Sequence, residues 1–390
     1  MITSKTRTLF AAFYAAYPPT GGASAVTYNL ARHWTGTKML VQIGDRPKAD
    51  HGQPNLQIET LSYDGLGERW QKLQRVPGWI FQMARIAREF RPDTIVLEGA
   101  SWIGYHWALL KVLRWRVPNA TIVYHAHNVE YDLRRQKHHS LVARLSRWFE
   151  QQVLREVDAA TAVSQIDAAR FDALYGVDTI QLANGVDLTS LQNVSAETVD
   201  AMRRRYRLGE STILFMGNYG YRPNREAIEL LVASVFPKLL ERRPDAQLLL
   251  LGGDVPHRQP WLVTPGLVAA EDLPALIKTA AVSVAPIFSG SGTRLKILES
   301  LGAGVPVVTS AKGMEGLPLR PDLDVARAET AENFVDAIDA LLGGTESERK
   351  ALCMRSMAAA KRFDWADVVA TAEGNLARQC WRPGVRRAPR

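Results

Sequence analysis

Segments typical of buried strands alternate with segments typical of amphipathic helices along most of this 390-residue chain. In the first half, the strand-like runs TLFAAFY, DTIVLEG and ATIVYHAHN each lead into a helix-like segment, and AATAVS and TIQLANGVD follow. Strands buried on both faces have such nearly continuous apolar runs, because helices cover both sides of a parallel sheet. The alternation therefore predicts an α/β protein with doubly wound parallel sheets.

The same alternation starts a second time at TILFMGNY, after a polar stretch at 191–210 that has no strand signal. A chain of this length is also too long for one ordinary core. We therefore predict two Rossmann-like domains facing a cleft, over residues 1–190 and 210–363, joined by the polar stretch. We expect the last helix, over about 364–382, to pack back on the first domain.

Composition excludes several classes of protein. The two cysteines, Cys353 and Cys380, have no spacing that suggests a zinc site or a disulfide framework. We see no convincing signal peptide and no run of apolar residues long enough to span a membrane. The net charge is +8, and residues 101–150 contribute +5 of it, with eight Lys or Arg against three Asp or Glu. We expect a cytoplasmic protein whose basic region is either a solvated helix face or a surface for an anionic partner.

The stretch GSGTRLKILESLGAGVPVVTS, at 290–310, predicts a loop, a helix, a turn and a buried strand in that order. Arg294 and Lys296 lie at the predicted helix start, where free N–H groups favour an anion. A dinucleotide-binding reading is weak, because the third glycine of that fingerprint is missing.

Two places in the first half also suggest ligand contacts. Gly21 and Gly22 follow the first strand and allow a ligand to approach the backbone at a helix start, although a simple tight turn explains them nearly as well. His125 and His127 lie two residues apart at a strand end and share a face, but local sequence offers no third metal ligand. For His127 we weigh a ligand contact equally against a structural role.

Together with FMGNYGYRPNREAIELL, LANGVD, AHNVE and GGAS, the 290–317 stretch resembles the family 4 (group 1) retaining glycosyltransferases of the GT-B fold. The resemblance implies two Rossmann-like domains around a nucleotide-sugar, with the acceptor on the N-terminal domain and the donor on the C-terminal one. It implies a hexosyltransferase of polysaccharide biosynthesis whose acceptor is a sugar or a lipid-linked precursor. Because the nucleotide-sugar is a substrate, we expect no cofactor, and we expect no nucleic-acid partner.

Residue roles follow from the same resemblance. Glu299 matches the second glutamate of the family's Glu-x7-Glu motif, which binds the ribose hydroxyls, whereas Ser291 replaces the first glutamate. The family's diphosphate-binding Arg and Lys are also replaced, by Asn218 and by Pro223 and Asn224. Arg294 and Lys296 are the expected substitutes, with Arg225 a weaker one, so no metal is required. The expected catalytic residues are His127, Arg294 and Lys296, and the expected donor-binding residues are Gly22, Gly217, Asn218, Ser291, Gly292, Thr293, Leu295 and Glu299.

Three questions stay open at this point. A nucleotide-sugar epimerase of the same fold and a catalytically silent scaffold both remain alternatives, the second because the first motif glutamate is lost. Attachment to the inner face of an anionic membrane is a third, through the basic residues Arg134, Arg135 and Lys137. We expect the neighbouring apolar stripe of Leu141, Leu145, Trp148 and Phe149 to pack on the sheet rather than to meet lipid.

Overall fold

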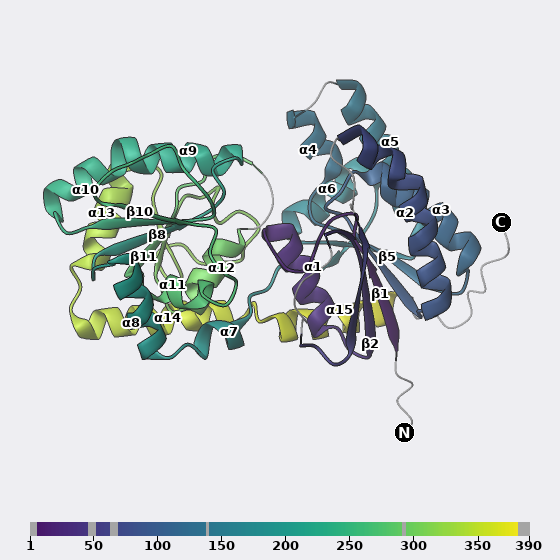
Figure 1. Ribbon diagram of the computed structural model, residues 1–390. Coiled ribbons are helices and arrows are strands. Elements are labelled where there is room, and N and C mark those ends of the chain that lie inside the picture. Colours follow the sequence, from purple (N-terminus) through teal and green to yellow (C-terminus); the bar gives the residue numbers. More distant parts are fainter. Residues whose placement is uncertain (1–5, 46–51, 63–68, 138–139, 291–293, 381–390) are drawn as a thin grey trace. The chain divides into compact units, whose positions relative to one another are not determined.

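The computed structural model describes residues 6–45, 52–62, 69–137, 140–290 and 294–380, and the chain divides into two compact units. Unit 1 contains the chain up to Asn184 together with the segment that starts at Trp365, and unit 2 runs from Gly185 to Asp364. Each unit has one parallel sheet with helices on both faces (Figure 1). The alternation of strand-like and helix-like segments thus correctly predicts the α/β class.

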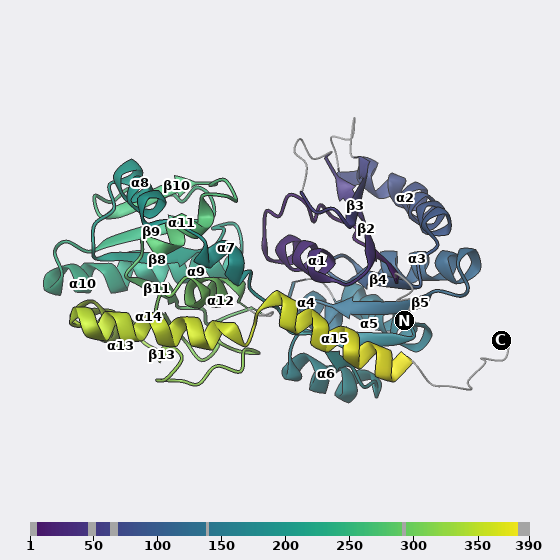
Figure 2. The ribbon, with the colours of Figure 1, turned by 90° about the horizontal axis from the view of Figure 1, so that it is seen from below.

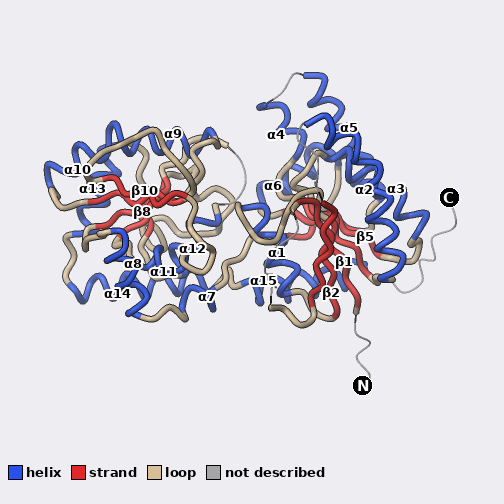
Figure 3. The backbone as a smooth tube through the Cα atoms, viewed as in Figure 1, coloured by secondary structure: helices blue, strands red, loops and turns tan. Residues whose placement is uncertain are grey.

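Unit 1 is built around a seven-stranded sheet in the order β3-β2-β1-β4-β5-β6-β7, with every neighbouring pair parallel. Its elements are β1 (Arg7–Ala11), α1 (Gly22–His33), β2 (Thr37–Gly44), β3 (Leu56–Ser62), α2 (Arg69–Phe90), β4 (Thr94–Glu98), α3 (Ile103–Arg116), β5 (Thr121–Ala126), α4 (Glu130–Lys137), α5 (Ser140–Glu156), β6 (Ala159–Ala162), α6 (Gln165–Tyr175), β7 (Ile180–Gln181) and α15 (Trp365–Cys380). Figure 3 shows the strands in red at the centre of each unit.

Burial explains the apolar strands of unit 1. Most side chains of β1, β4 and β5 are buried, as their continuous apolar sequences predict. The helices α2, α3 and α5 lie next to one another on one face of the sheet, and α1 and α15 lie together on the other. β2 and β3 are not identified by the sequence analysis.

The helix α15 returns to unit 1 after the chain has passed through unit 2. It packs against α1 (Figure 2). Its side chains Trp365, Val369 and Leu376 are buried. The backbone N–H and the hydroxyl of Thr35 also donate hydrogen bonds to Glu373 Oε1, at 3.0 and 2.7 Å. These contacts make α15 part of the unit 1 fold.

Unit 2 has a six-stranded parallel sheet in the order β10-β9-β8-β11-β12-β13. Its elements are α7 (Leu188–Gln192), α8 (Ala196–Tyr206), β8 (Thr212–Met216), α9 (Arg222–Leu230), the π-helix η1 (Leu231–Val235), α10 (Phe236–Arg242), β9 (Gln247–Leu251), β10 (Leu262–Gly266), α11 (Leu273–Lys278), β11 (Val282–Ala285), α12 (Leu295–Gly302), β12 (Val307–Thr309), β13 (Ala326–Arg327), α13 (Ala331–Leu342) and α14 (Glu346–Lys361).

The boundary between the units lies earlier than the sequence suggests. The polar stretch 191–210, expected to be a linker, contributes α8 and the end of α7 to unit 2. Leu188 and Leu191 are buried against Gly302, where an added Cβ atom would come within 3.0 Å of both. Apolar contacts at three-residue spacing therefore attach this segment to unit 2, although its overall composition is polar.

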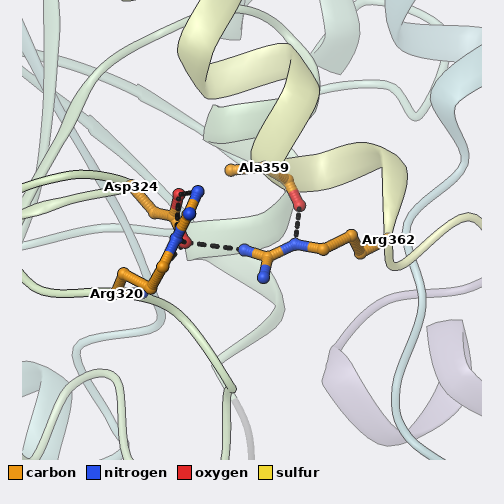
Figure 4. A network of polar contacts seen from close by, with 4 residues as sticks. All are labelled: Arg320, Asp324, Ala359 and Arg362. Atoms are coloured by element: carbon orange, nitrogen blue, oxygen red, sulfur yellow. Dashed lines mark hydrogen bonds and ion pairs between the residues drawn. The ribbon is translucent and has the colours of Figure 1, made fainter.

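A buried carboxylate fixes the end of α14 to the loop that precedes β13. Asp324 accepts hydrogen bonds from the guanidinium groups of Arg320, at 2.7 Å, and Arg362, at 2.6 Å (Figure 4). Arg362 also donates to the carbonyl oxygen of Ala359. The hydrogen bonds from Arg320, followed by those from Arg362, lower the pKa of Asp324 to about 2.

Candidate functional site

In unit 2, the predicted donor-binding residues gather where β8 ends and α12 begins. Gly217 follows β8, and an added Cβ atom there would come within 2.6 Å of the Asn224 side chain, so a larger residue would displace that side chain. Asn218 turns the chain by accepting the Gly220 N–H at 2.7 Å, and its carbonyl oxygen accepts from Asn224 Nδ2 at 3.1 Å. Gly217 and Asn218 therefore hold Asn224 in place.

Lys296, in the first turn of α12, reaches this same asparagine. Its Nζ donates to Asn224 Oδ1 at 2.9 Å and lies 4.3 Å from the centre of the Phe215 ring. Burial lowers the pKa of Lys296 to about 7, and the nearby Arg294 guanidinium lowers it too, whereas Glu299 raises it. With a pKa near neutrality, the neutral amine form of Lys296 gains a proton readily when an anion arrives.

Arg294 immediately precedes α12 and is buried. Its Nη2 donates to the carbonyl oxygen of Ser289 at 3.2 Å, and burial lowers its pKa, an effect that Tyr221 and Glu315 oppose. Gly290, between Ser289 and Arg294, has φ +85, and an added Cβ atom would lie 2.8 Å from the Tyr221 hydroxyl. The loop and the arginine are thus fixed against Tyr221.

Glu299 lies one turn further along α12 than Leu295, and both side chains are half-buried. Burial raises the pKa of Glu299, and Lys296 opposes this rise. The Glu299 carboxylate accepts no hydrogen bond from the residues that the structure describes, so its oxygens are available to a ligand. The predicted residues Ser291, Gly292 and Thr293 lie outside the described residues.

Sequence reasoning missed several polar residues around this site. The sequence identifies Asn224 only as a replacement for the family lysine, yet its side chain is the partner of Lys296. Ser289 donates to Glu226 Oε2 at 2.5 Å, and Tyr219 donates to Glu229 Oε1 at 2.6 Å. The segment between β8 and α9, residues 217–221, has an ordinary length for a strand-to-helix connection, so its length gives no signal for these residues.

The sequence also contains one Asp-x-Asp triplet, Asp322-Leu323-Asp324, which the sequence analysis overlooked. Such a pair of carboxylates can hold a divalent cation together with substrate phosphates. Here Asp324 is already paired with Arg320 and Arg362 (Figure 4). The residues present do not fit a metal at this position.

In unit 1, Gly22 is the first residue of α1 and is exposed. The hydroxyl oxygen of Ser24 accepts the backbone N–H groups of Thr20 and Gly21, each at 2.9 Å. The side chain thereby closes the loop between β1 and α1 into a tight turn. A turn role and a ligand role for Gly22 both fit this geometry.

His127 follows β5 directly and contacts a carboxylate that the sequence analysis did not single out. Its Nε2 lies 2.9 Å from Oε2 of Glu98, the last residue of β4. The ring of His125 lies edge-on to that of His127, with 4.8 Å between the ring centres. Because β4 and β5 pair in parallel, with Glu98 opposite His125, their carboxyl ends bring these three side chains together.

The apolar stripe on α5 differs from its prediction. Leu141, Leu145 and Trp148 are exposed rather than packed on the sheet, and only Phe149 is half-buried. The buried side of α5 contains Ala143, Ser146, Glu150 and Val153 instead. Two polar contacts select this side, because Trp102 Nε1 donates to Ser146 Oγ at 3.2 Å and Glu150 accepts the first N–H of α4 at 2.8 Å.

None of the helices described here combines the length and the apolar composition that crossing a lipid bilayer requires.

Two family models match this chain, one in each half. The model described as Glycosyltransferase Family 4 matches residues 20–190, and the model described as Glycosyl transferases group 1 matches residues 210–343. The first match contains His127, and the second contains Lys296 and Glu299.

Curated relatives are similar over part of their length. A phosphatidyl-myo-inositol mannosyltransferase of Mycolicibacterium smegmatis is 28% identical over 208 residues, which are 50% of each chain. A GDP-mannose-dependent monoacylated alpha-(1-6)-phosphatidylinositol monomannoside mannosyltransferase of Corynebacterium glutamicum is 23% identical over 65% of this chain and 68% of its own. The match to the first of these relatives covers about half of that relative's length.

Solved structures show the same fold. Alr3699/HepE of Anabaena, crystallised with UDP and glucose, superimposes with a TM-score of 0.74 at 15% identity, over 95% of this chain and 99% of that one. At this identity the likeness concerns the fold alone, and it is the two-sheet GT-B fold that the sequence analysis predicts. Because models of one glycosyltransferase group match both halves, the chain belongs to the family 4, or group 1, glycosyltransferases.

Proposed function

We propose that this protein transfers a hexose from a nucleotide-sugar to an acceptor, with retention of the anomeric configuration. One observation carries the proposal. The ammonium group of Lys296 lies 2.9 Å from Asn224, close to the place where relatives are expected to present their diphosphate-binding lysine. A cation from α12 thus replaces a cation lost from the loop after β8, as expected if the site still binds a diphosphate.

Unit 2 is the donor-binding unit in this proposal. Lys296 and Arg294 neutralise the diphosphate, because an ammonium and a guanidinium group both form charge-assisted hydrogen bonds with phosphate oxygens. The half-buried Glu299 carboxylate accepts from the two ribose hydroxyls. With two cations and the amides of a helix start available, the diphosphate needs no metal ion.

Catalysis in this proposal is mainly electrostatic. Negative charge grows on the diphosphate as the sugar leaves, and preorganised cations stabilise that charge without having to reorganise. Lys296 is suited to this step because its partners Asn224 and Phe215 already fix its position. His127 of unit 1 is proposed to contact the transferred sugar, and unit 1 is proposed to bind the acceptor.

We propose mannose as the sugar and GDP-mannose as the first donor to test. Two relatives that match this chain are named as mannosyltransferases, and one of them as GDP-mannose-dependent. HepE was crystallised with UDP and glucose, so UDP-glucose is the second donor to test.

A lipid-linked acceptor is proposed because α5 exposes an apolar surface. Leu141, Leu145 and Trp148 are exposed on this helix next to the exposed cations Arg144 and Arg147. Such a helix can lie in the headgroup layer, with about 1 kcal/mol of attraction for each basic residue near an anionic leaflet. The phosphatidylinositol acceptors in the relatives' names agree with this choice. The protein would then work as a peripheral protein at the inner face of a membrane.

The donor experiment measures acceptor-dependent release of nucleotide from GDP-mannose and UDP-glucose, with and without EDTA. We expect release with phosphatidylinositol-type acceptors, an unchanged rate in EDTA, and retention in the product by NMR. Lys296→Met should abolish release, whereas Lys238→Met, at a surface lysine paired with Glu332, should not. Conversion of the donor without acceptor would indicate an epimerase, and nucleotide binding without turnover would indicate a silent scaffold.

The membrane experiment measures sedimentation with vesicles. We expect the protein to pellet with anionic vesicles at low salt, to be released by high salt, and not to pellet with neutral vesicles. Leu145→Glu with Trp148→Glu should prevent pelleting. Leu267→Glu, which changes a leucine that is 82% exposed and outside this surface, is the matched control. Equal pelleting of both variants would contradict a role for α5.

A further inference from the structure

Glu98 is a fully buried carboxylate in unit 1 that the proposed reaction does not yet use. It is the last residue of β4, and its exposed fraction is 0%. Isolated carboxylates are rarely found at such depth, because burying a charge is costly unless the charge is paired and hydrogen-bonded. Its partners therefore indicate what the residue is for.

Oxygen Oε2 of Glu98 has two hydrogen-bond partners. The Thr27 hydroxyl donates to it at 2.7 Å, and Nε2 of His127 lies 2.9 Å from it. Thr27 is fixed in turn by the Tyr14 hydroxyl, 2.6 Å away. Beside them, His106 Nε2 donates to the backbone carbonyl oxygen of Glu98 at 2.8 Å. Side chains and backbone together hold this carboxylate in one orientation.

The charges in this cluster identify which atom donates. Burial raises the pKa of Glu98, but the hydrogen bonds that join its carboxylate to His127 and Thr27 oppose this rise, and the pKa lies below its usual value. Glu98 is therefore an ionised carboxylate at neutral pH and can only accept hydrogen bonds. It follows that Nε2 of His127 carries the proton in the hydrogen bond between them.

The neighbouring histidines do not compete for this role. Burial lowers the pKa of His125 and of His106 to about 4, so both rings are neutral at physiological pH. Nδ1 of His125 is 2.7 Å from the Thr161 hydroxyl, which fixes that ring. Of these three rings, His127 is the one that the Glu98 carboxylate holds through a side-chain hydrogen bond.

We infer that Glu98 is a positioning residue for His127: it accepts the Nε2–H of the ring and leaves Nδ1 as the nitrogen that meets the ligand. In the neutral ring, Nδ1 then accepts a hydrogen bond, as from a sugar hydroxyl. Second partners of this kind commonly fix the tautomer and orientation of a functional histidine. The contact between Nδ1 and the sugar depends on the proposed function, whereas the tautomer of His127 does not.

A bound metal ion is the main competing explanation of the cluster. Ligand atoms of Glu98, His125 and His127 lie within 4.8 Å of one another. Glu98 Oε1 and His125 Nε2 are both buried and have no hydrogen-bond partner among the residues that the structure describes. However, a metal bound through Nε2 of His127 would displace the hydrogen bond to Glu98, so the two explanations predict different tautomers.

The first test records long-range 1H–15N NMR spectra of the full chain with 15N-labelled histidine, with the His127 signals assigned from His127→Gln. We expect the wild-type ring to be protonated at Nε2 and bare at Nδ1. In Glu98→Gln, which keeps the shape but removes the charge, we expect a mixture of tautomers. Glu89→Gln, at an exposed carboxylate on α2, should leave the signals unchanged.

A wild-type ring protonated at Nδ1, or a spectrum that Glu98→Gln leaves unchanged, would overturn the inference. So would Zn2+ that binds the wild-type protein one to one and shifts the His125 and His127 signals together.

The second test measures turnover. Glu98→Gln should lower kcat at least about tenfold, which is less than the roughly 100-fold lower end of general acid–base effects because the His127 ring itself remains, while KM for the donor changes less than about twofold. Glu98→Gln with an altered tautomer but full turnover would overturn the positioning role. If the wild-type protein shows the expected tautomer but no transferase activity, the proposed function fails while the structural part of the inference stands.

Discussion

The affinity of this protein for nucleoside diphosphates should fall as the pH rises above neutrality, because of Lys296. Its pKa in the free protein is about 7, against an ordinary value of 10.5, chiefly because of burial. Near the ammonium group lie one cation, Arg294, and one carboxylate, Glu299, together with the Asn224 amide and the Phe215 ring.

The direction of this pH dependence follows from the protonation state of Lys296 in the free protein. Below neutrality Lys296 is already charged, so a diphosphate binds without proton uptake. Above neutrality the free side chain is mostly neutral, and binding an anion must first add a proton, at a cost of about 1.4 kcal/mol for each pH unit. From about pH 7 to about pH 8.5 the affinity should therefore fall about 15-fold, or about 1.6 kcal/mol, if the bound pKa lies above this range.

Isothermal titration calorimetry of GDP and UDP can measure this effect. Repeating each titration in two buffers of different ionisation enthalpy counts the protons taken up on binding. We expect close to one proton per nucleotide at about pH 8.5 and about half a proton at about pH 7. Lys296→Met should bind weakly at every pH without proton uptake, and Lys238→Met should behave like the wild type. A pH-independent affinity, or the same slope in Lys296→Met, would refute the reasoning.

Three further predictions follow from other residues. Glu299→Ala should weaken nucleotide binding in calorimetry by about 1.5–3 kcal/mol, the range for hydrogen bonds to a charged group, and unchanged affinity would remove Glu299 from the site. Asp324→Asn should lower the free energy of unfolding in urea by about 1–2 kcal/mol at neutral pH, less than the full pKa shift implies because Arg320 and Arg362 are largely exposed. Because folding lowers the pKa of Asp324 from its ordinary 3.8 to about 2, its contribution to stability is complete at pH values above the ordinary pKa and is lost as the pH falls toward about 2. The free energies of unfolding of the variant and the wild type should therefore converge at low pH, and a difference that stays constant with pH would count against the pairing. Gly217→Ala should reduce nucleotide affinity by displacing Asn224 and with it Lys296. The control Gly209→Ala should not, because the nearest atom there is 3.5 Å from the added methyl group. If Gly217→Ala binds nucleotide as tightly as the wild type, Asn224 can move without cost.

The sequence predicts the two sheets because their strands are buried on both faces and so have continuous apolar runs. β1, β4 and β5 show this pattern, as do β8, β9 and β11. β3 is harder to identify, because it lies at the sheet edge and most of its side chains are only partly buried. Edge position depends on which strands pair, and this is a property of the whole chain rather than of a local pattern.

The individual contacts of the site could not be predicted in the same way. Lys296 and Asn224 are 72 positions apart, and nothing local to either residue indicates that they meet. A single glutamate at the end of a strand, such as Glu98, is likewise ordinary until parallel pairing puts it beside His127. For α5, the apolar stripe indicates the wrong buried side, because Ser146 has its partner Trp102 just before α3 and Glu150 has a partner at the start of α4.

The return of α15 to unit 1 determines the order in which the protein can be completed during synthesis. A ribosome must make all of unit 2 before it makes Trp365 and the rest of this helix. Until then, the surface of α1 that α15 will cover is exposed to water, and the Thr35 N–H lacks its acceptor Glu373. Domains usually fold as they emerge, starting from the N-terminus. Here the unit that is begun first is finished last, and in the interval its uncovered α1 surface is available to chaperones.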